Sequence, residues 1–408
     1  MSLERFEKLL DQEVKAIREA GTAKGDETVI AGVLKAEGER GPRYLLEGQG
    51  EKPFIRMNAN SYLGLALEPE IIEAEEQAAR SFGVGPGAVR FISGSFTPHL
   101  ALEARLAAFH GREAAMITSS AYTSTLGVVS TLTTPETMII SDELNHNCII
   151  NAMKLARPKG KKIYPHNDVA ALAAALEESV GQADAAMVIT DGVFSMRGDY
   201  APLKEIRDLC TRFDEKFERG VVLVIDDSHG VGAYGATGRG TEEITGSGPV
   251  EILIATLGKA LGVNGGYFVS SQSVIDFMRE KNPFYIYTNP ITPSEASAAL
   301  AGLELLDSEA GVKRLEHLSA LTERFSRGLV EAGHETIDSP HPVTPLVVRD
   351  TARTNALVKH LFEQGVLATG LAYPVVPRGD DLIRFQLCAD HTEADVDAVL
   401  AAIRAFEG

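Results

Sequence analysis

The sequence predicts an α/β fold in which a mostly parallel, seven-stranded sheet carries helices on both faces. The prediction rests on an alternation of short apolar runs with helical stretches, such as those at residues 168–180 and 202–217. Such alternation is typical of parallel sheets whose two faces are both buried. The predicted strands lie at residues 114–118, 137–140, 162–164, 185–190, 221–225, 251–255 and 267–270.

Both ends of the chain depart from this alternation. Apolar residues at helical spacing between Leu3 and Ile17 predict an amphipathic N-terminal helix. The glycine-rich stretch at 26–53 predicts an extended arm with short strands, and a pattern change near Pro293 predicts a second, α+β unit. We therefore expect an N-terminal helix and arm (1–53), a large domain (54–293) and a smaller C-terminal domain (294–408).

The composition limits the classes of function that the chain can serve. Its 408 residues include 39 Lys and Arg against 57 Asp and Glu, which gives a formal net charge of −18. An acidic chain of this kind is not expected to bind nucleic acid or anionic membranes non-specifically. In addition, no apolar run reaches the length of a membrane span. From the charge and from the lack of such a run, we expect neither nucleic acid nor a bilayer as a partner.

The three cysteines, Cys148, Cys210 and Cys388, are far apart and show no CxxC spacing. An odd number of dispersed cysteines favours reduced thiols over a disulfide framework or a zinc site. The sequence therefore predicts a cytoplasmic protein that holds no metal.

Lys259 is the first candidate for catalytic chemistry. It follows the predicted strand at 251–255 and stands among small residues, in the segment Thr256-Leu-Gly-Lys259-Ala-Leu-Gly262. Ligands of parallel sheets bind outside the carboxyl ends of the strands. A lysine in that position can be desolvated and approached closely by a flat ligand, and its amine then becomes a nucleophile.

An acid and a histidine follow the preceding strand. The run at 221–225 leads into Asp226, and His229 comes three residues later. An aspartate beside a pyridine nitrogen keeps it protonated, so that the ring can withdraw electrons from a carbanion. Alone, Asp226 could simply end a strand, and a lone histidine is more often structural. Together with Lys259, the pair predicts a site for pyridoxal 5′-phosphate (PLP), held covalently by Lys259.

Small hydroxyl residues indicate where the phosphate of such a cofactor would bind. The segment from Ser119 to Ser124 follows the predicted strand at 114–118. Free N–H groups and the dipole at the start of a helix bind phosphate well, although an ordinary helix cap explains the same residues. His146, which follows another predicted strand, could stack on the cofactor ring or serve the fold alone.

Two further patterns have simpler explanations. The run from Gly230 to Gly235 matches the glycine fingerprint of dinucleotide sites, but loop-forming residues follow it where a helix should begin. We therefore do not expect a nicotinamide cofactor. Basic residues between Lys154 and Lys162 could meet the phosphates of coenzyme A, but a solvated helix end is the simpler explanation.

Several motifs occur in an order that is specific to one enzyme family. They are Asn58-Ala-Asn60-Ser-Tyr-Leu-Gly-Leu65, Arg90-Phe-Ile-Ser-Gly94 through Glu103, Thr190-Asp-Gly-Val-Phe-Ser195 through Asp199, Asp226-Asp-Ser-His229, Thr256-Leu-Gly-Lys259 and Arg384-Phe-Gln386. From about Phe6 to the C-terminus, the chain resembles the α-oxoamine synthases, a branch of the fold-type I PLP enzymes. The resemblance implies a large domain around a seven-stranded sheet and a smaller α+β domain.

The resemblance also implies roles for individual residues. Lys259 would hold PLP and move the α-proton of an amino acid, while Asp226 would pair with the ring nitrogen. The other implied cofactor-binding residues are His229 and Ser195 at the ring oxygen, His146 on the ring face, and Ser120, Ala121, Tyr122, Thr256 and a partner subunit's Thr288 at the phosphate. Asn60 and Arg384 would hold the amino-acid carboxylate. A phosphate ligand from a partner implies a homodimer with shared active sites.

Within the family, segments such as Val89-Arg-Phe-Ile92 and Tyr373-Pro-Val-Val-Pro377 are most similar to the glycine C-acetyltransferases, or 2-amino-3-ketobutyrate CoA ligases. This likeness implies condensation of glycine with acetyl-CoA, reversible as cleavage of 2-amino-3-oxobutanoate by CoA. The loop after Lys259 is shorter than in that branch, and Ala121-Tyr-Thr-Ser124 replaces its Cys-Phe-Asp-Ala.

Two alternatives stay open. The first is another α-oxoamine synthase that joins a longer acyl-CoA to serine or alanine, like serine palmitoyltransferase or 8-amino-7-oxononanoate synthase. The second, from a different class, is a non-catalytic PLP-fold subunit that binds an active partner.

Overall fold

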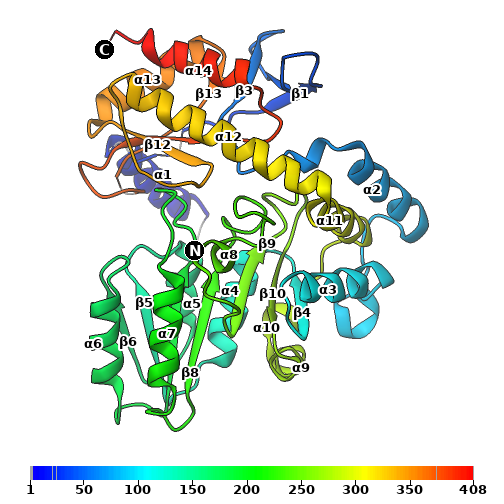
Figure 1. Cartoon of the computed structure of the whole chain (residues 1–408), viewed down its shortest axis with the longest axis vertical. Coiled ribbons are helices and arrows are strands. Elements are labelled where there is room, and N and C mark those ends of the chain that lie inside the picture. The colour runs from blue at the N-terminus through cyan, green and yellow to red at the C-terminus, as the bar shows by residue number, and fades with distance from the viewer. Residues whose placement is uncertain (1–2, 21, 24, 374, 408) are drawn as a thin grey trace.

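The seven predicted strands form one sheet. In the computed structural model, which describes residues 3–20, 22–23, 25–373 and 375–407, the sheet order is β4-β10-β9-β8-β7-β5-β6 (Figure 1). The strands are β4 (Ala114–Thr118), β5 (Thr137–Asp142), β6 (Gly160–Tyr164), β7 (Ala185–Asp191), β8 (Val221–Asp226), β9 (Ile252–Thr256) and β10 (Gly266–Ser270). The predicted α/β fold class is confirmed.

The sheet is parallel from β6 to β9 and antiparallel only at β10, which pairs with β9 on one side and β4 on the other. The antiparallel step follows from chain length, because the short segment 257–265 between β9 and β10 holds no crossover helix. This segment carries Lys259, so the exception to the parallel rule lies at the predicted site.

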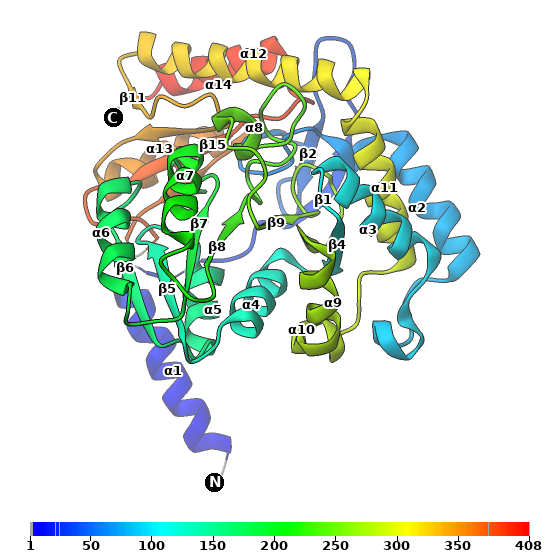
Figure 2. The same cartoon turned by 60° about the horizontal axis from the view of Figure 1, so that its bottom comes forward.

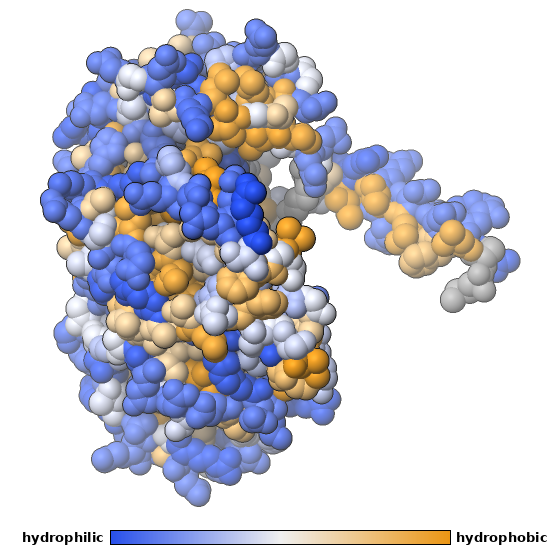
Figure 3. All heavy atoms as spheres, turned by 90° about the vertical axis from the view of Figure 1, so that its right-hand side faces the viewer, coloured by the Kyte–Doolittle hydropathy of each residue, from blue (hydrophilic) through white to orange (hydrophobic). Residues whose placement is uncertain are grey.

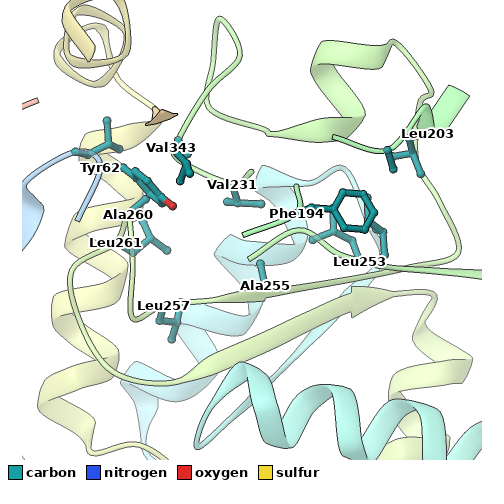
Figure 4. Packing of buried hydrophobic residues seen from close by; sticks show 14 of the residues in the cluster. Tyr62, Phe194, Leu203, Val231, Leu253, Ala255, Leu257, Ala260, Leu261 and Val343 are labelled. Carbon is teal, nitrogen blue, oxygen red and sulfur yellow. The ribbon is translucent and has the colours of Figure 1, made fainter. Parts of the chain in front are cut away.

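Helices cover both faces of the sheet. On one face, α6 (Val169–Ser179) and α7 (Leu203–Asp214) pack against Leu223 and Leu253; on the other, α4 (Ala121–Leu132) and α5 (Asn147–Leu155) pack against Val224 and Ile254. Successive residues of the central strands therefore enter two separate cores, which is why these strands are continuous apolar runs. Figure 4 shows part of the first core, where Leu253 packs near Phe194 and Leu203.

The remaining helices of the large domain surround these layers. They are α2 (Pro69–Phe82), α3 (Thr97–Phe109), α8 (Thr241–Thr245), α9 (Gln272–Lys281) and α10 (Pro283–Ile286), with a short 3-10 turn at Leu65–Leu67 and a π-helical turn at Arg90–Gly94. The predicted helix at the start of the C-terminal part is α11 (Pro293–Leu306), and it packs against α2 and α3.

The C-terminal part is an α+β unit above the carboxyl ends of the large sheet (Figure 1). Its sheet has the order β11-β12-β15-β14 and is antiparallel. The strands are β11 (Glu335–Thr336), β12 (Val343–Val347), β14 (Thr369–Leu371) and β15 (Leu382–Gln386), and the helices are α12 (Glu309–Glu331), α13 (Thr351–Glu363) and α14 (Glu393–Arg404).

The N-terminal arm forms the predicted short strands β1 (Ile30–Leu34), β2 (Arg43–Leu46) and β3 (Pro53–Arg56). Sequence analysis did not anticipate their partner, because β3 pairs in parallel with β13 (Val366–Leu367) to complete the sheet β1-β2-β3-β13. A largely buried ion pair between Arg43 and Asp395 joins the arm to α14 as well.

The predicted N-terminal helix is α1 (Leu3–Glu19), and it projects away from the rest of the chain (Figures 2 and 3). Its apolar side chains, including Phe6, Leu10 and Val14, are exposed and form a stripe along one side of the helix. Over the residues that the structure describes, no helix has both the length and the apolar character needed to cross a bilayer.

The C-terminal unit provides a test of core packing. Phe325 on α12 is fully buried, and its ring lies 5.1 Å from that of Phe385 on β15. Phe325→Ala should lower the free energy of unfolding by about 3–5 kcal/mol, because it removes buried apolar area and leaves a cavity. Val330→Ala, on the same helix but 59% exposed, should change it by no more than about 0.5 kcal/mol. Urea unfolding of both variants measures the difference, and equal effects would contradict this account of the core.

Candidate active site

The carboxyl ends of the central strands enclose a pocket of about 240 Å³. It is lined by Ser120, Ala121, Tyr122, His146, Cys148, Asp191, Val193, Ser195, Asp226, Ser228, His229, Thr256 and Lys259. Nine of these residues were predicted from the sequence as cofactor-binding or catalytic. Their side chains come from segments between residues 120 and 259, so only the folded sheet could bring them together.

Lys259 lies in a tight loop between β9 and β10. The loop is closed by hydrogen bonds from the Leu257 amide to the Gly265 carbonyl (3.0 Å) and from the Gly262 amide to the Lys259 carbonyl (3.0 Å). Gly262 has a φ of 74°, and a Cβ there would lie 2.5 Å from the backbone nitrogen of Ala66. Glycine is therefore required for the loop to pass so close to its neighbour.

Burial controls the protonation of Lys259. It lowers the pKa of the amine to about 8, even though the nearby carboxyl groups of Asp226 and Asp191 favour the charged form. An amine with this pKa is free of its proton in a substantial fraction of molecules near neutral pH. That state is the nucleophilic one.

Asp226 stands at the end of β8 with its carboxyl group in the pocket. Its Oδ1 accepts a hydrogen bond from the Ser228 amide (3.1 Å), and its Oδ2 lies 3.2 Å from the Thr125 hydroxyl and 3.5 Å from the Cys148 sulfur. Burial raises the pKa of the Cys148 thiol, so it acts as a weak donor to the carboxylate. These donors leave Asp226 an acceptor toward the pocket.

Asp191 is a site residue that sequence analysis did not single out. Parallel pairing places it opposite Asp226 in the register of β7 and β8. Burial, and then the charge of Asp226, raise the pKa of Asp191 well above its ordinary value. Its Oδ2 accepts a hydrogen bond from the His146 amide at 2.9 Å, which fixes the start of α5. Two acids that end adjacent parallel strands are the signal that could have revealed it.

His229 is held neutral by its surroundings. Burial, followed by the charge on Lys259, lowers its pKa well below the ordinary value. Its Nδ1 lies 2.6 Å from the Tyr62 hydroxyl, whose pKa is raised by burial. Because that hydroxyl keeps its proton and donates to Nδ1, the neutral ring carries its own proton on Nε2.

Tyr62 and His341 complete the support of His229, and neither was singled out as a site residue from the sequence. Tyr62 has a φ of 30°, a conformation that aromatic residues rarely adopt. His341 accepts a hydrogen bond from the Val343 amide at Nδ1 (3.1 Å) and donates from Nε2 to the His229 carbonyl (2.7 Å). The C-terminal unit therefore fixes the backbone of a residue in the large domain.

The predicted phosphate cradle is the start of α4. Ser120 caps the helix, with its Oγ accepting from the Thr123 amide (3.1 Å) and its own amide donating to Thr123 Oγ1 (3.1 Å). The next N–H groups, those of Ala121 and Tyr122, have no partner within the helix. A Cβ on Gly266 would lie 2.0 Å from the nitrogen of Ala121, so β10 passes directly against the helix start.

His146 serves the fold and also faces the pocket, and its stacking on a cofactor ring stays a prediction. It lines the pocket, and its Nδ1 also accepts a hydrogen bond from the Cys148 amide (3.3 Å) as the cap of α5. Its ring lies edge-on to that of Tyr122, with 6.3 Å between the centroids. Burial lowers the pKa of His146, so a neutral ring is available for contact with a flat ligand.

The predicted carboxylate-binding residues lie beside the pocket. Arg384 on β15 donates from Nη1 to the Ser195 carbonyl at 2.8 Å. The side-chain amide oxygen of Gln386 faces this guanidinium and accepts a hydrogen bond from Arg384 Nε at 2.6 Å. The side-chain amides of Gln386 and Asn60 approach to 3.3 Å. One planar guanidinium is thus held in place between both parts of the chain.

Three other features of the sequence do not line the pocket. Thr288 does not line the pocket of its own chain, and its hydroxyl contacts the Phe284 carbonyl at the end of α10. Its assignment to a partner's active site stays a prediction. The glycine run from Gly230 to Gly235 forms turns rather than the start of a helix, as expected. Of the basic cluster, Lys162 pairs with Glu178 at 2.6 Å.

The pocket fits PLP. The free N–H groups at the start of α4 suit a phosphate, Asp226 suits a protonated ring nitrogen, and Lys259 supplies an amine with a lowered pKa. Because Gly266 lies so close to Ala121, the start of α4 forms the surface on which the phosphate would bind. The fold and the pocket therefore define a PLP-dependent enzyme of fold type I.

Comparisons with known proteins agree with this class. The model of the family described as aminotransferase class I and II matches residues 52–403. The chain is 37% identical to the 8-amino-7-oxononanoate synthase of Geotalea daltonii over 96% of each chain. It is 35% identical to the mitochondrial 2-amino-3-ketobutyrate coenzyme A ligase of Homo sapiens, over 98% of this chain and 92% of that protein.

A solved structure shares nearly the whole fold. The serine palmitoyltransferase of S. paucimobilis, with PLP and myriocin bound, superposes with a TM-score of 0.87 at 25% identity, over 99% of this chain and 98% of that one. The chain belongs to the aminotransferase class I and II family and, within it, to the α-oxoamine synthases. It is a PLP-dependent C-acyltransferase. Its relatives include both 2-amino-3-ketobutyrate coenzyme A ligases and 8-amino-7-oxononanoate synthases.

The contact between Gly266 and α4 makes a specific prediction. Gly266→Ala should force the helix start away from β10 and weaken PLP binding about tenfold, which corresponds to about 1.4 kcal/mol. The measurement is titration of the cofactor-free protein with PLP. Gly85→Ala is the matched control, because a Cβ there meets no atom within 4 Å. Unchanged PLP affinity in Gly266→Ala would contradict the cradle.

Proposed function

We propose that this protein condenses an amino acid with an acyl-CoA, with PLP bound in the pocket and Lys259 as its covalent anchor. The observation that carries the proposal is the convergence of Lys259, Asp226 and His229 on one pocket beside Arg384. When bound, PLP supplies an electron sink that stabilises a carbanion at the amino-acid α-carbon. All other tasks fall to residues of the chain.

Asp226 and the start of α4 would orient the cofactor. The Asp226 carboxyl group, which is kept in place by the Ser228 amide and Thr125, would pair with a protonated ring nitrogen. The N–H groups of Ala121 and Tyr122, with the Thr256 hydroxyl, bind the phosphate. His146 and Ser195 also line the pocket, where His146 would cover one face of the ring and Ser195 would meet the ring oxygen.

Arg384 would bind the amino-acid carboxylate, because its planar fork matches a carboxylate in a bidentate manner. Its surroundings already restrict the fork through the Ser195 carbonyl and Gln386. Asn60 lies next to Gln386 and can add a donor from the opposite side. A substrate held at its carboxylate presents the α-proton to Lys259.

Lys259 and His229 would handle the protons. Burial gives the Lys259 amine a pKa of about 8, which suits a general base near neutral pH. The Nε2–H of His229 can donate to a developing oxyanion on the thioester carbonyl, because Tyr62 already occupies Nδ1. A neutral histidine donates this hydrogen bond without adding a second positive charge beside Lys259.

Glycine and acetyl-CoA are the substrates that we propose first, with the reverse cleavage of 2-amino-3-oxobutanoate by CoA. Support comes from the segments that resemble the glycine C-acetyltransferases and from the likeness to a 2-amino-3-ketobutyrate coenzyme A ligase. The likeness to an 8-amino-7-oxononanoate synthase supports the alternative equally: a longer acyl-CoA with alanine or serine.

We also propose a homodimer in which a partner subunit's Thr288 contributes to the phosphate site. In one chain, Tyr287 beside Thr288 is 78% exposed, and Phe91 and Ile92 of the π-helical turn are 62% and 64% exposed. Exposed aromatic and aliphatic side chains of this size are typical of residues that a partner covers. Analytical ultracentrifugation would show a single species of one-chain mass if the proposal is wrong.

Lys259→Ala should abolish the absorbance band of the covalent link between lysine and cofactor and reduce turnover to below about one per cent, because it removes both the anchor and the base. The measurements are the absorption spectrum of the PLP-loaded protein and CoA release. Lys313→Ala is the control, since that lysine is exposed on α12 and only pairs with Glu309. Substantial turnover by Lys259→Ala would refute the assignment. A wild-type protein without the cofactor band would instead favour a non-catalytic subunit.

Substrate choice is tested by CoA release from acyl-CoAs of graded length, each with glycine, serine or alanine. We expect the highest kcat/KM with glycine and acetyl-CoA. A preference for a long acyl chain, or for a dicarboxylic acyl-CoA with alanine, would overturn that choice and leave the family assignment intact. The cofactor absorbance of the same samples shows that each assay used loaded enzyme.

A further inference from the structure

A short hairpin at residues 192–201 lies between the two parts of the chain. Val193 and Tyr200 form an antiparallel bridge, and the Phe194 amide donates to the Asp199 carbonyl at 2.9 Å. The hairpin carries Ser195, which lines the pocket and whose carbonyl accepts from Arg384. The position of this hairpin therefore sets the position of the guanidinium.

The C-terminal unit holds one side of the hairpin. The Ser339 hydroxyl donates to the Gly198 carbonyl at 2.6 Å, and a Cβ on Gly198 would lie 2.3 Å from the Val343 carbonyl oxygen. The hairpin thus lies tightly against the start of β12, two residues after His341, which supports His229.

The large domain holds the other side through His166, which follows β6. Its Nδ1 lies 3.2 Å from Asp142 Oδ1 at the end of β5, and its Nε2 lies 3.1 Å from Asp199 Oδ2 on the hairpin. The ring packs edge-on against Phe194, with 4.3 Å between the centroids. Nothing in the proposed chemistry uses His166, which does not line the pocket.

The charges around His166 favour its cationic form. Asp142 is fully buried and also accepts from the Leu144 and Asn167 amides, so it is held as an acceptor. Burial opposes a charge on His166, but hydrogen bonds to Asp142 and Asp199 outweigh it and raise its pKa to about 9. The other charged groups are Glu143, which accepts from the His166 amide, and Arg197, which pairs with Asp199 at 3.0 Å.

We propose that His166 is a positioning residue that, as a cation between Asp142 and Asp199, holds the 192–201 hairpin where Ser195 and Arg384 bind the substrate carboxylate. The effect of the hairpin on binding of the substrate carboxylate rests on the proposed function, whereas the fixation of the hairpin by His166 does not. The bridge joins the end of β5 to the hairpin, so it fixes the hairpin to the rigid parallel sheet.

The first test compares His166→Gln and Asp199→Asn with wild type by hydrogen exchange of the hairpin amides. Both variants should raise exchange at residues 193–200 about tenfold, because each removes a charged hydrogen bond to the hairpin. Asp199→Asn leaves the His166–Asp142 contact intact and serves if His166→Gln does not fold. His334→Gln, at the end of α12 and away from the pocket, is the control. Hairpin exchange equal to the control in the folded variants would overturn the proposal.

Steady-state kinetics then test the link to the carboxylate. A loosened hairpin should raise KM for the amino acid about tenfold with little change in kcat, since Arg384 binds ground and transition states alike. The absorbance of the bound cofactor should be retained. Faster hydrogen exchange in the hairpin together with an unchanged KM would show that the hairpin does not position Arg384. If no amino acid is a substrate for wild type, the proposed function fails and the hydrogen-exchange result alone decides the hold on the hairpin.

The charge on His166 gives a pH test with a defined sign. A group whose pKa is raised on folding stabilises the fold fully below its unfolded value of about 6.5 and loses this effect as pH rises through about 9. The Tm difference between wild type and His166→Gln should therefore be larger at pH 6 than at pH 10. In the control, burial lowers the pKa of His334, so its Tm difference should be smaller at pH 6 than at pH 10, which is the opposite trend. A constant difference in His166→Gln would overturn the cationic bridge.

Discussion

The site depends on the parallel register that ends β7 and β8 side by side. This register places Asp191 opposite Asp226, two acids buried at the same sheet edge. Two buried carboxyl groups at one edge cannot both ionise cheaply, and burial together with the charge of its neighbour raises the pKa of Asp191 well above its ordinary value. The Asp191 carboxyl also holds the start of α5 and hence His146. One pairing of strands thus sets the electrostatics and part of the walls of the pocket.

The low polarity of the buried pocket then sets the protonation of the remaining groups. Burial brings the pKa of Lys259 to about 8 and keeps His229 and Tyr62 neutral, so the pocket offers an amine, a donor on Nε2 and a single acid facing the ligand. The C-terminal unit contributes directly, through His341 on the His229 carbonyl and Arg384 on the Ser195 carbonyl. Changes in the fit between the two units would therefore alter both the position of His229 and the proposed carboxylate site.

The agreement between sequence and structure was strongest where the signal was local. The central strands were found because they alternate residues into two cores and so form apolar runs, while Lys259 and Asp226 stood out at their ends. Missed features depended on distant partners. The pairing of β3 with β13 joins residues about three hundred positions apart, and Tyr62, Asp191, Cys148 and His341 act through neighbours remote in the chain.

By itself, the sequence determined the α/β class, the strands and the residue types at their ends, because periodicity and turn chemistry are properties of neighbouring residues. Only the tertiary structure decided that the pKa of Asp191 is raised, which nitrogen of His229 holds its proton and what fixes Arg384. These properties depend on burial and on contacts between segments far apart in the chain. Such distances and burial are set only when the sheet and the C-terminal unit come together.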